Sequence, residues 1–90
     1  MVEADFILQH PRGVIAARDG VIVYIGSVED AGREVRRLRN AMRIDATGCV
    51  LLPAAGVLTV GGPLSVVIVK EDEPGTVRME IANGKIVRWT

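Results

Sequence analysis

The sequence is poor in the residues that carry most metal and redox chemistry. Its 90 residues include one cysteine, Cys49, and one histidine, His10. A single cysteine excludes an internal disulfide and any Cys-x-x-Cys pair, and catalytic zinc needs about three protein ligands plus an open position. The sequence therefore argues against a self-contained metal hydrolase, and we expect no cofactor and no metal. We interpret His10 as a loop histidine and Cys49 as a buried small hydrophobic residue.

The chain also lacks an excess of charge and has few aromatic residues. Its 11 Lys and Arg balance 11 Asp and Glu, and aromatic residues make up 3% of the sequence. Domains built mainly to bind nucleic acid are basic, and binding of single strands needs aromatic side chains for stacking. We therefore expect no nucleic-acid partner. The 49% hydrophobic content nevertheless indicates a folded chain, with room for one domain.

No uninterrupted hydrophobic run in the sequence has the length of a membrane span. The uncharged stretch 46–69 has the roughly 20 residues that a spanning helix needs, but Pro53, Gly61 and other Gly and Pro residues interrupt it. The acidic amino terminus lacks the basic and then apolar order of a signal peptide. These features predict no membrane association and a cytoplasmic location.

Turn-forming dipeptides divide the sequence into short β-strands. Asp19-Gly20 and Asn83-Gly84 each lie between runs rich in β-branched residues, which is typical of two-residue hairpins whose turn positions need positive φ. The charged segment 70–76 contains Pro-Gly and separates two more apolar runs. We predict a mainly β protein, a small antiparallel β-sandwich or pseudo-barrel of about seven or eight short strands.

One segment has helical rather than strand spacing. Apolar residues at 28, 31, 35, 38 and 42 recur at intervals of three and four, and Ser27 is a suitable N-cap. We predict one α-helix over about 28–41 that packs on the sheet by this apolar stripe. Its other face is expected to present a weak candidate anion patch, formed by Arg33, Arg36, Arg37, Arg39 and Arg43.

Two stretches taken together resemble a known enzyme superfamily. Residues 19–26 (Asp-Gly-Val-Ile-Val-Tyr-Ile-Gly) and 44–53 (Ile-Asp-Ala-Thr-Gly-Cys-Val-Leu-Leu-Pro) resemble the amino-terminal segment of the metal-dependent amidohydrolases, such as dihydroorotases, hydantoinases and imidazolonepropionases. Residues 60–70 and 81–87 are similar to their carboxy-terminal segment. The resemblance implies that these end segments form one small β domain, called the composite domain, which in the family lies beside a catalytic (β/α)₈ barrel.

The resemblance ends where the barrel of the family begins. In the family, the proline corresponding to Pro53 precedes a His-x-His run that binds metal, whereas Ala54–Thr59 contains neither histidine nor acid. A barrel needs at least about 200 residues, and only this stretch separates Pro53 from Val60. The chain is therefore predicted to be a single composite-type β domain over residues 1–90. Its amino-terminal segment comprises residues 1–53, an apparent junction comprises residues 54–62, and its carboxy-terminal segment comprises residues 63–90.

The resemblance implies a non-catalytic scaffold. A composite domain without its barrel leaves apolar surface to cover, so we expect a homo-oligomer, most simply a dimer. Val57, Leu58 and Val60, near the junction, are the candidate interface residues. Alternatively, the chain is an accessory component of a metal-dependent hydrolase that acts on carbon–nitrogen bonds other than peptide bonds and has its barrel on a separate chain. A third possibility is an engineered or trimmed enzyme in which a short linker replaces the barrel.

Overall fold

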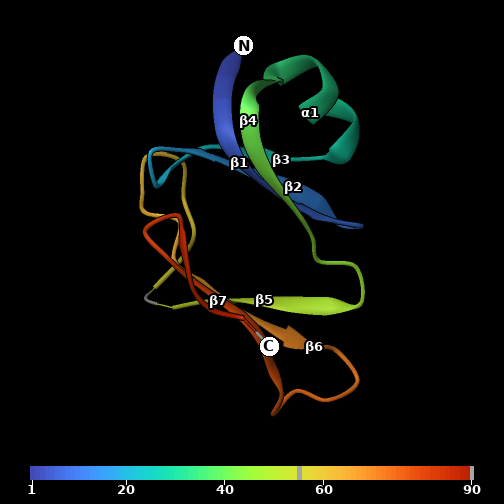
Figure 1. Cartoon of the computed structure of the whole chain (residues 1–90). Helices are drawn as coiled ribbons and strands as arrows, with labels where there is room; N and C mark the ends of the chain where they lie inside the picture. The colour runs from blue at the N-terminus through green and yellow to red at the C-terminus, as the bar shows by residue number, and fades with distance from the viewer. Residues whose placement is uncertain (55, 90) are drawn as a thin grey trace.

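The computed structural model describes residues 1–54 and 56–89, and the chain is mainly β (Figure 1). Its elements are β1 (Val2–His10), β2 (Gly13–Arg18), β3 (Val21–Gly26), α1 (Val28–Glu34), β4 (Val35–Asp45), β5 (Cys49–Pro53), β6 (Val66–Lys70), β7 (Val77–Ala82) and β8 (Lys85–Trp89). They form two four-stranded sheets, with the strand orders β3-β2-β1-β4 and β5-β6-β7-β8. The predicted fold class is confirmed, as two open sheets.

The elements are arranged in three layers. Figure 1 shows the sheet of β1 to β4 above the sheet of β5 to β8, with α1 on the outer side of the upper sheet. All strand pairs are antiparallel except β1 and β4, which run parallel. Among the described residues, no helix is long and apolar enough to cross a membrane.

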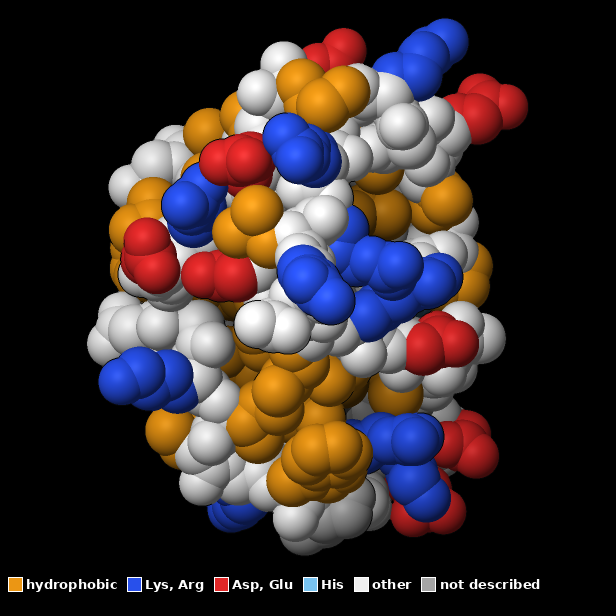
Figure 2. Space-filling view, turned by 45° about the horizontal axis from the view of Figure 1, so that its top comes forward, with side chains coloured by type: hydrophobic (Ala, Val, Ile, Leu, Met, Phe, Trp, Pro, Cys, Tyr) orange, Lys and Arg blue, Asp and Glu red, His pale blue; other side chains and the backbone are white. Residues whose placement is uncertain are grey.

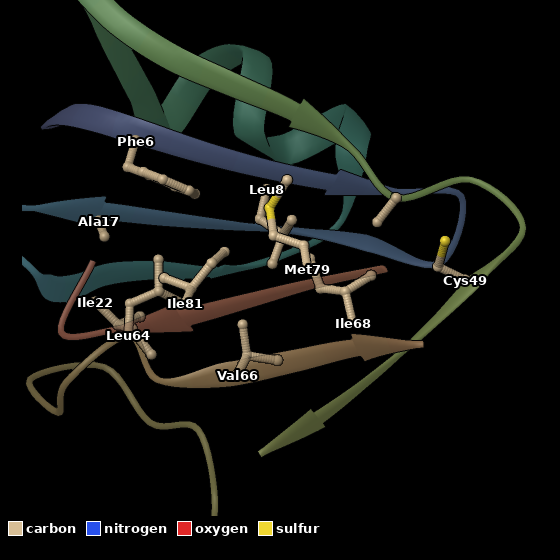
Figure 3. Packing of buried hydrophobic residues seen from close by; sticks show 11 residues of the cluster. Phe6, Leu8, Ala17, Ile22, Cys49, Leu64, Val66, Ile68, Met79 and Ile81 are labelled. Carbon is tan, nitrogen blue, oxygen red and sulfur yellow. The ribbon is translucent and has the colours of Figure 1, made fainter. Parts of the chain in front are cut away.

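The hydrophobic core lies between the two sheets (Figure 3). Alternate residues of a strand face the same side, so Phe6 and Leu8 of β1 point toward Val66 and Ile68 of β6. The buried cluster consists of Phe6, Leu8, Ala17, Ile22, Ala46, Cys49, Leu64, Val66, Ile68, Met79 and Ile81. Cys49 is only 2% exposed, which agrees with its interpretation as a small hydrophobic residue. Among the described residues, the core contains no buried polar or charged side chain.

The two predicted hairpin turns are present, and they contact each other. Asp19-Gly20 joins β2 to β3, Asn83-Gly84 joins β7 to β8, and all four residues have positive φ. A Cβ atom added to Gly84 would lie 2.5 Å from the Cα atom of Gly20. Leu64 lies between the turns: its N–H donates to Gly20 O (2.9 Å), and its carbonyl accepts from the Gly84 N–H (2.8 Å). One end of the sandwich is therefore closed by backbone contacts between its two sheets.

The predicted helix over 28–41 is wrong beyond residue 34. α1 begins at Val28, and the Ser27 Oγ caps it by accepting from the Asp30 N–H at 3.0 Å. The helix ends at Glu34, and β4 follows directly from Val35. An isolated helix this short is marginal in water, and Gly32 weakens it further, so pairing with β1 determines the conformation of the next residues.

The helix prediction failed because apolar residues of a bulged strand can recur at the same spacing as those of a helix. The β1–β4 pairs Ala4–Arg37 and Phe6–Met42 lie on either side of a shift in register, so β4 bulges across residues 38–41. Partly buried residues recur every third position along β4, at 35, 38, 41 and 44. The bulge thus replaces the strict alternation of a regular strand with a period close to that of a helix.

Candidate functional site

The junction leaves and re-enters the lower sheet at neighbouring positions. Pro53, the last residue of β5, pairs with Val66, the first residue of β6. Beyond this pair, the Ala54 N–H donates to Ser65 O at 3.1 Å. The two ends of the junction therefore lie side by side, and the pairing of β5 with β6 holds them together.

At its carboxy-terminal end, the junction crosses to the edge of the upper sheet. The Gly61 N–H donates to Ile22 O, and the Ile22 N–H donates to Gly62 O, both at 2.8 Å. Pro63 adds an antiparallel bridge to Val21. Unpaired edge strands are sites of unwanted association, and this crossing covers the first part of β3. The same crossing brings Leu64 into the core.

The three candidate interface residues of the junction differ in exposure. Val57 is 80% exposed and Val60 is 61% exposed, whereas Leu58 is partly buried against the core. Leu58 therefore anchors the segment to the sandwich. Only Val57 and Val60 present most of their apolar surface to another molecule.

The predicted arginine patch lies mainly on a strand rather than on a helix. Arg33 is on α1, where its guanidinium forms an ion pair with Asp30 at 2.5 Å. The other four arginines, Arg36, Arg37, Arg39 and Arg43, are on β4. The predicted position on a helix face is wrong because the helix ends before these residues begin.

The β4 arginines differ in their contacts. Arg36 lies 3.8 Å from a carboxylate oxygen of Glu3, and Arg43 donates a hydrogen bond to the Gln9 side chain. Arg37 and Arg39 have no ion pair or side-chain hydrogen bond with any residue that the structure describes. These two exposed guanidinium groups are the portion of the predicted patch that an anion can reach without competition.

His10 connects the two sheets. Its Nδ1 atom accepts from the backbone N–H of Arg12 at 3.1 Å, so the ring proton must be on Nε2. Nε2 then donates to the carbonyl of Cys49 at 2.8 Å. Both ring nitrogens are therefore engaged, and His10 acts here as a structural link between the end of β1 and the start of β5. No local pattern in the sequence indicates this bond, since 39 positions separate its partners.

A groove lies beside His10, between β2 and β3 of the upper sheet and β5 of the lower sheet. Its volume is about 540 Å³, and its apolar lining includes Ile15, Ile25 and Leu51. Its charged lining residues, Arg12 and Glu71, are on exposed loops. In the portion of the chain that the structure describes, no three His, Cys, Asp or Glu residues are grouped to hold a metal ion.

Asp45 stabilises the turn that leads from β4 to β5. Its Oδ1 atom accepts from the Thr47 hydroxyl (2.6 Å) and from the Thr47 N–H (2.9 Å). These two hydrogen bonds, the hydroxyl bond first, lower the pKa of the Asp45 carboxyl below its ordinary value of 3.8, and the positive charges of Arg43 and Arg78 act in the same direction. These contacts favour a structural role for the Asp45 carboxylate over a role in proton transfer.

Comparison with known proteins finds no match to this chain among family models, curated proteins or solved structures. The similarity to the amidohydrolases therefore remains a prediction from the residues quoted above. The geometry itself offers two kinds of surface, namely the exposed valines of the junction and the arginines of β4.

Proposed function

We propose that the chain is a non-catalytic β scaffold, similar to the composite domain of amidohydrolases, which self-associates through its junction. The observation that carries the proposal is the closed base of the junction, where Pro53 pairs with Val66 and Ala54 bonds to Ser65. A composite domain is made from two chain segments that flank an insertion. Such a domain can remain folded without the insertion only when the two segments meet in this way.

The strand order supports the same proposal. β5 belongs to the amino-terminal segment of the chain, yet it lies at the edge of the sheet that the carboxy-terminal strands β6, β7 and β8 form. In turn, Pro63, the first residue of the carboxy-terminal segment, forms a bridge to Val21 of β3 in the upper sheet. Each segment of the chain therefore completes the sheet of the other, as expected of one domain composed of two segments.

The chemistry of the two most reactive side-chain types supports a role without catalysis. His10 uses both ring nitrogens in hydrogen bonds within the fold, and the thiol of Cys49 is buried in the core. A general base or metal ligand needs a free lone pair directed at a substrate or ion. We infer that these residues maintain the sandwich.

Self-association through the junction rests on a small apolar surface. Val57 and Val60 are both mostly exposed, and a twofold contact would place each valine pair against the same pair of the partner. A contact of this size is well below the roughly 1,200 Å² of stable complexes. We therefore expect a weak dimer that dissociates on dilution.

Sedimentation velocity from micromolar to millimolar concentration tests this expectation. The unmodified chain should shift from monomer to dimer, and the double variant Val57→Ser/Val60→Ser should stay monomeric. Val28→Ser is the control, because Val28 is exposed on α1, away from the junction. A monomer at millimolar concentration, or a dimer that survives the double substitution, would refute association through the junction.

A second candidate function is that of an accessory chain for a separately made hydrolase barrel. The exposure of Val57 and Val60 favours it, because these residues stand where the resemblance places a barrel. Metal analysis and incubation with a cyclic amide such as hydantoin distinguish the possibilities. Stoichiometric zinc with hydrolysis by the chain alone would refute the scaffold proposal, whereas co-purification of a zinc-binding barrel protein would replace it with the accessory function.

A further inference from the structure

α1 lies over the outer face of the upper sheet without packing tightly against it. The helix buries none of its residues. A recess of about 290 Å³ remains between the helix and the sheet, and we call it the α1 recess. Its sheet side is formed by Ile7, Gln9 and Val14, and its helix side includes Val28, Ala31 and Gly32.

The sheet side of the α1 recess is mainly apolar. Phe6 and Leu8 of β1 point into the core. Because successive residues of a strand point to opposite faces, Ile7 and Gln9 point toward α1. Val14 of β2 pairs with Gln9 and shares its face, and it is 5% exposed. The recess therefore has an apolar floor on the side of the sheet away from the core.

The charged residues that line the α1 recess are both arginines of β4, namely Arg37 and Arg43. Arg43 pairs with Ile7 and so belongs to the face that carries the floor. Among the residues that the structure describes, no Asp or Glu lines this recess. Figure 2, in which the α1 end of the molecule comes forward, shows a cluster of Lys and Arg side chains beside hydrophobic side chains. The charge of the lining is therefore of one sign.

The two guanidinium groups retain donors for a ligand. Arg37 has no ion pair or side-chain hydrogen bond with any described residue. Arg43 donates to the Gln9 side chain, which leaves further N–H groups of its guanidinium available. Asp45 lies opposite Gln9 on β4 and attracts Arg43 electrostatically, but its Oδ1 atom already accepts two hydrogen bonds from Thr47.

We propose that the α1 recess binds a small organic carboxylate that carries one short aliphatic chain. The chain would cover Ile7 and Val14, and the carboxylate would accept hydrogen bonds from Arg37 and Arg43. Guanidinium groups suit this role because their parallel N–H groups match the two oxygens of a carboxylate. The inference does not rest on the proposed scaffold function, since the junction does not line this recess.

The volume of the recess sets the size of the ligand. A water molecule takes about 30 Å³ of the liquid, so a recess of about 290 Å³ has room for roughly ten non-hydrogen atoms. Octanoate has this size. An inorganic anion would leave the apolar floor uncovered, and an uncharged chain would leave both guanidinium groups without a partner. The combined lining therefore selects an amphipathic anion over either of these ligands.

Titration of the isotope-labelled chain with octanoate, followed by NMR of the backbone amides, tests the proposal. The amides of Ala31, Gly32 and Arg43 should shift and saturate, with a Kd of about 1 mM for a ligand of this size. The amide of Gly75, in the loop between β6 and β7, should not shift. Acetate lacks the chain and octylammonium carries the opposite charge, so each should bind at least about tenfold more weakly than octanoate.

A pair of double variants on β4 localises the carboxylate. Arg37→Gln/Arg43→Gln should bind octanoate about tenfold or more weakly, because it removes both charged donors of the recess. Arg36→Gln/Arg39→Gln is the matched control, since it removes the same charge from the same strand at residues that do not line the recess. The affinity of this control variant should match that of the unmodified chain.

Gly32 gives a test from the helix side. A Cβ atom added to Gly32 would meet no atom within 4 Å, so a larger side chain can occupy this space. Gly32→Leu should weaken octanoate binding, and it should not unfold α1 because leucine favours a helix more than glycine does. Gly32→Ala also favours the helix but adds only a methyl group, so it should bind octanoate like the unmodified chain. Circular dichroism would confirm that each variant is folded.

Three results would overturn the proposal. The first is the absence of saturable shifts at the amides of the recess when octanoate is added. The second is binding of acetate, inorganic phosphate or octylammonium as tight as that of octanoate, which would mean that the recess does not recognise a chain and a carboxylate together. The third is an equal loss of affinity in the two β4 double variants, which would show general attraction of anions without a site.

Discussion

The two long sides of the sandwich differ in how the chain covers the hydrophobic core. On the side of β3 and β5, residues 61–63 pair with the edge of β3, and His10 bonds to the Cys49 carbonyl at the start of β5. On the side of β4 and β8, the same core ends in the exposed side chains of Met42 and Trp89. This small core is therefore covered only where a segment or a side chain crosses from one sheet to the other. We expect the stability of the fold to depend mainly on the first side.

The largest effect is expected at Leu64, where the crossing enters the core. Leu64 is fully buried, and its backbone bonds to both hairpin turns. The substitution Leu64→Ala removes buried methyl groups and leaves a cavity, which costs about 2–5 kcal/mol. Chemical denaturation monitored by circular dichroism would measure this loss in the free energy of unfolding.

Val60→Ala is the matched control for Leu64→Ala, because Val60 lies in the same crossing but is 61% exposed. Its cost should remain within about 0.5 kcal/mol. If Leu64→Ala leaves too little folded protein to measure, Leu64→Val gives a smaller loss in the same direction. Equal costs for the buried and the exposed position would contradict the role given to the crossing.

The next largest effect is expected where the hairpin turns touch. Gly84 and Gly48 have nearly the same φ, 77° and 78°, but only Gly84 faces backbone, with Gly20 Cα 2.5 Å from the position of an added Cβ. Gly48→Ala therefore measures the cost of positive φ alone, about 1 kcal/mol. Gly84→Ala should cost at least about 1 kcal/mol more, because the two turns must separate.

The Gly84 and Gly48 variants should be compared by urea denaturation under the same conditions. Hydrogen exchange of the Leu64 and Gly84 amides gives a second measurement, since both amides bond across this end of the sandwich. Exchange should accelerate in Gly84→Ala and remain unchanged in Gly48→Ala. Equal losses of stability in the two variants would show that the contact between the turns does not contribute to the free energy of unfolding.

The local features of the fold could be predicted from the sequence. Asp-Gly and Asn-Gly specify their hairpins because only a few residue types accept positive φ, and both turns formed where expected. The consecutive β-branched residues of β6 are typical of a buried strand, and Val66, Ile68 and Val69 are at most 5% exposed. In each case the signal lies within a few neighbouring residues.

The contacts between distant segments could not be predicted in this way. The parallel pairing of β1 with a bulged β4 moved the arginines from a helix to a strand, next to Met42. Neither the bond from His10 to Cys49 nor the contact of the two hairpin turns has a local signal. The recess lined by Phe6, Met42 and Ile86 arises from such long-range pairings, and for this reason no local spacing predicts it.

A smaller effect is expected for the link between the sheets at His10. In His10→Leu, the Cys49 carbonyl loses its side-chain donor and the Arg12 N–H loses its acceptor. Removing such hydrogen bonds costs about 1 kcal/mol of unfolding free energy, which thermal denaturation can detect. Nitrogen NMR of the unmodified chain should show the tautomer with its proton on Nε2. A ring protonated on Nδ1 would contradict the assigned bonds.

The smallest effect is expected at the turn from β4 to β5, which leads from one long side of the sandwich to the other. The two hydrogen bonds from Thr47 lower the pKa of Asp45, so the folded state favours the carboxylate. The pKa of Asp45 is lower in the folded than in the unfolded chain. The carboxylate therefore makes its full contribution to the free energy of unfolding above the ordinary pKa of 3.8, and this contribution is lost as the pH falls through the pKa of the folded chain.

Asp45→Asn keeps an acceptor oxygen but cannot titrate. Urea denaturation should therefore show a stability advantage of the unmodified chain over Asp45→Asn at neutral pH that shrinks in acid. An advantage that persists unchanged at low pH would mean that the charge of Asp45 does not contribute to the turn.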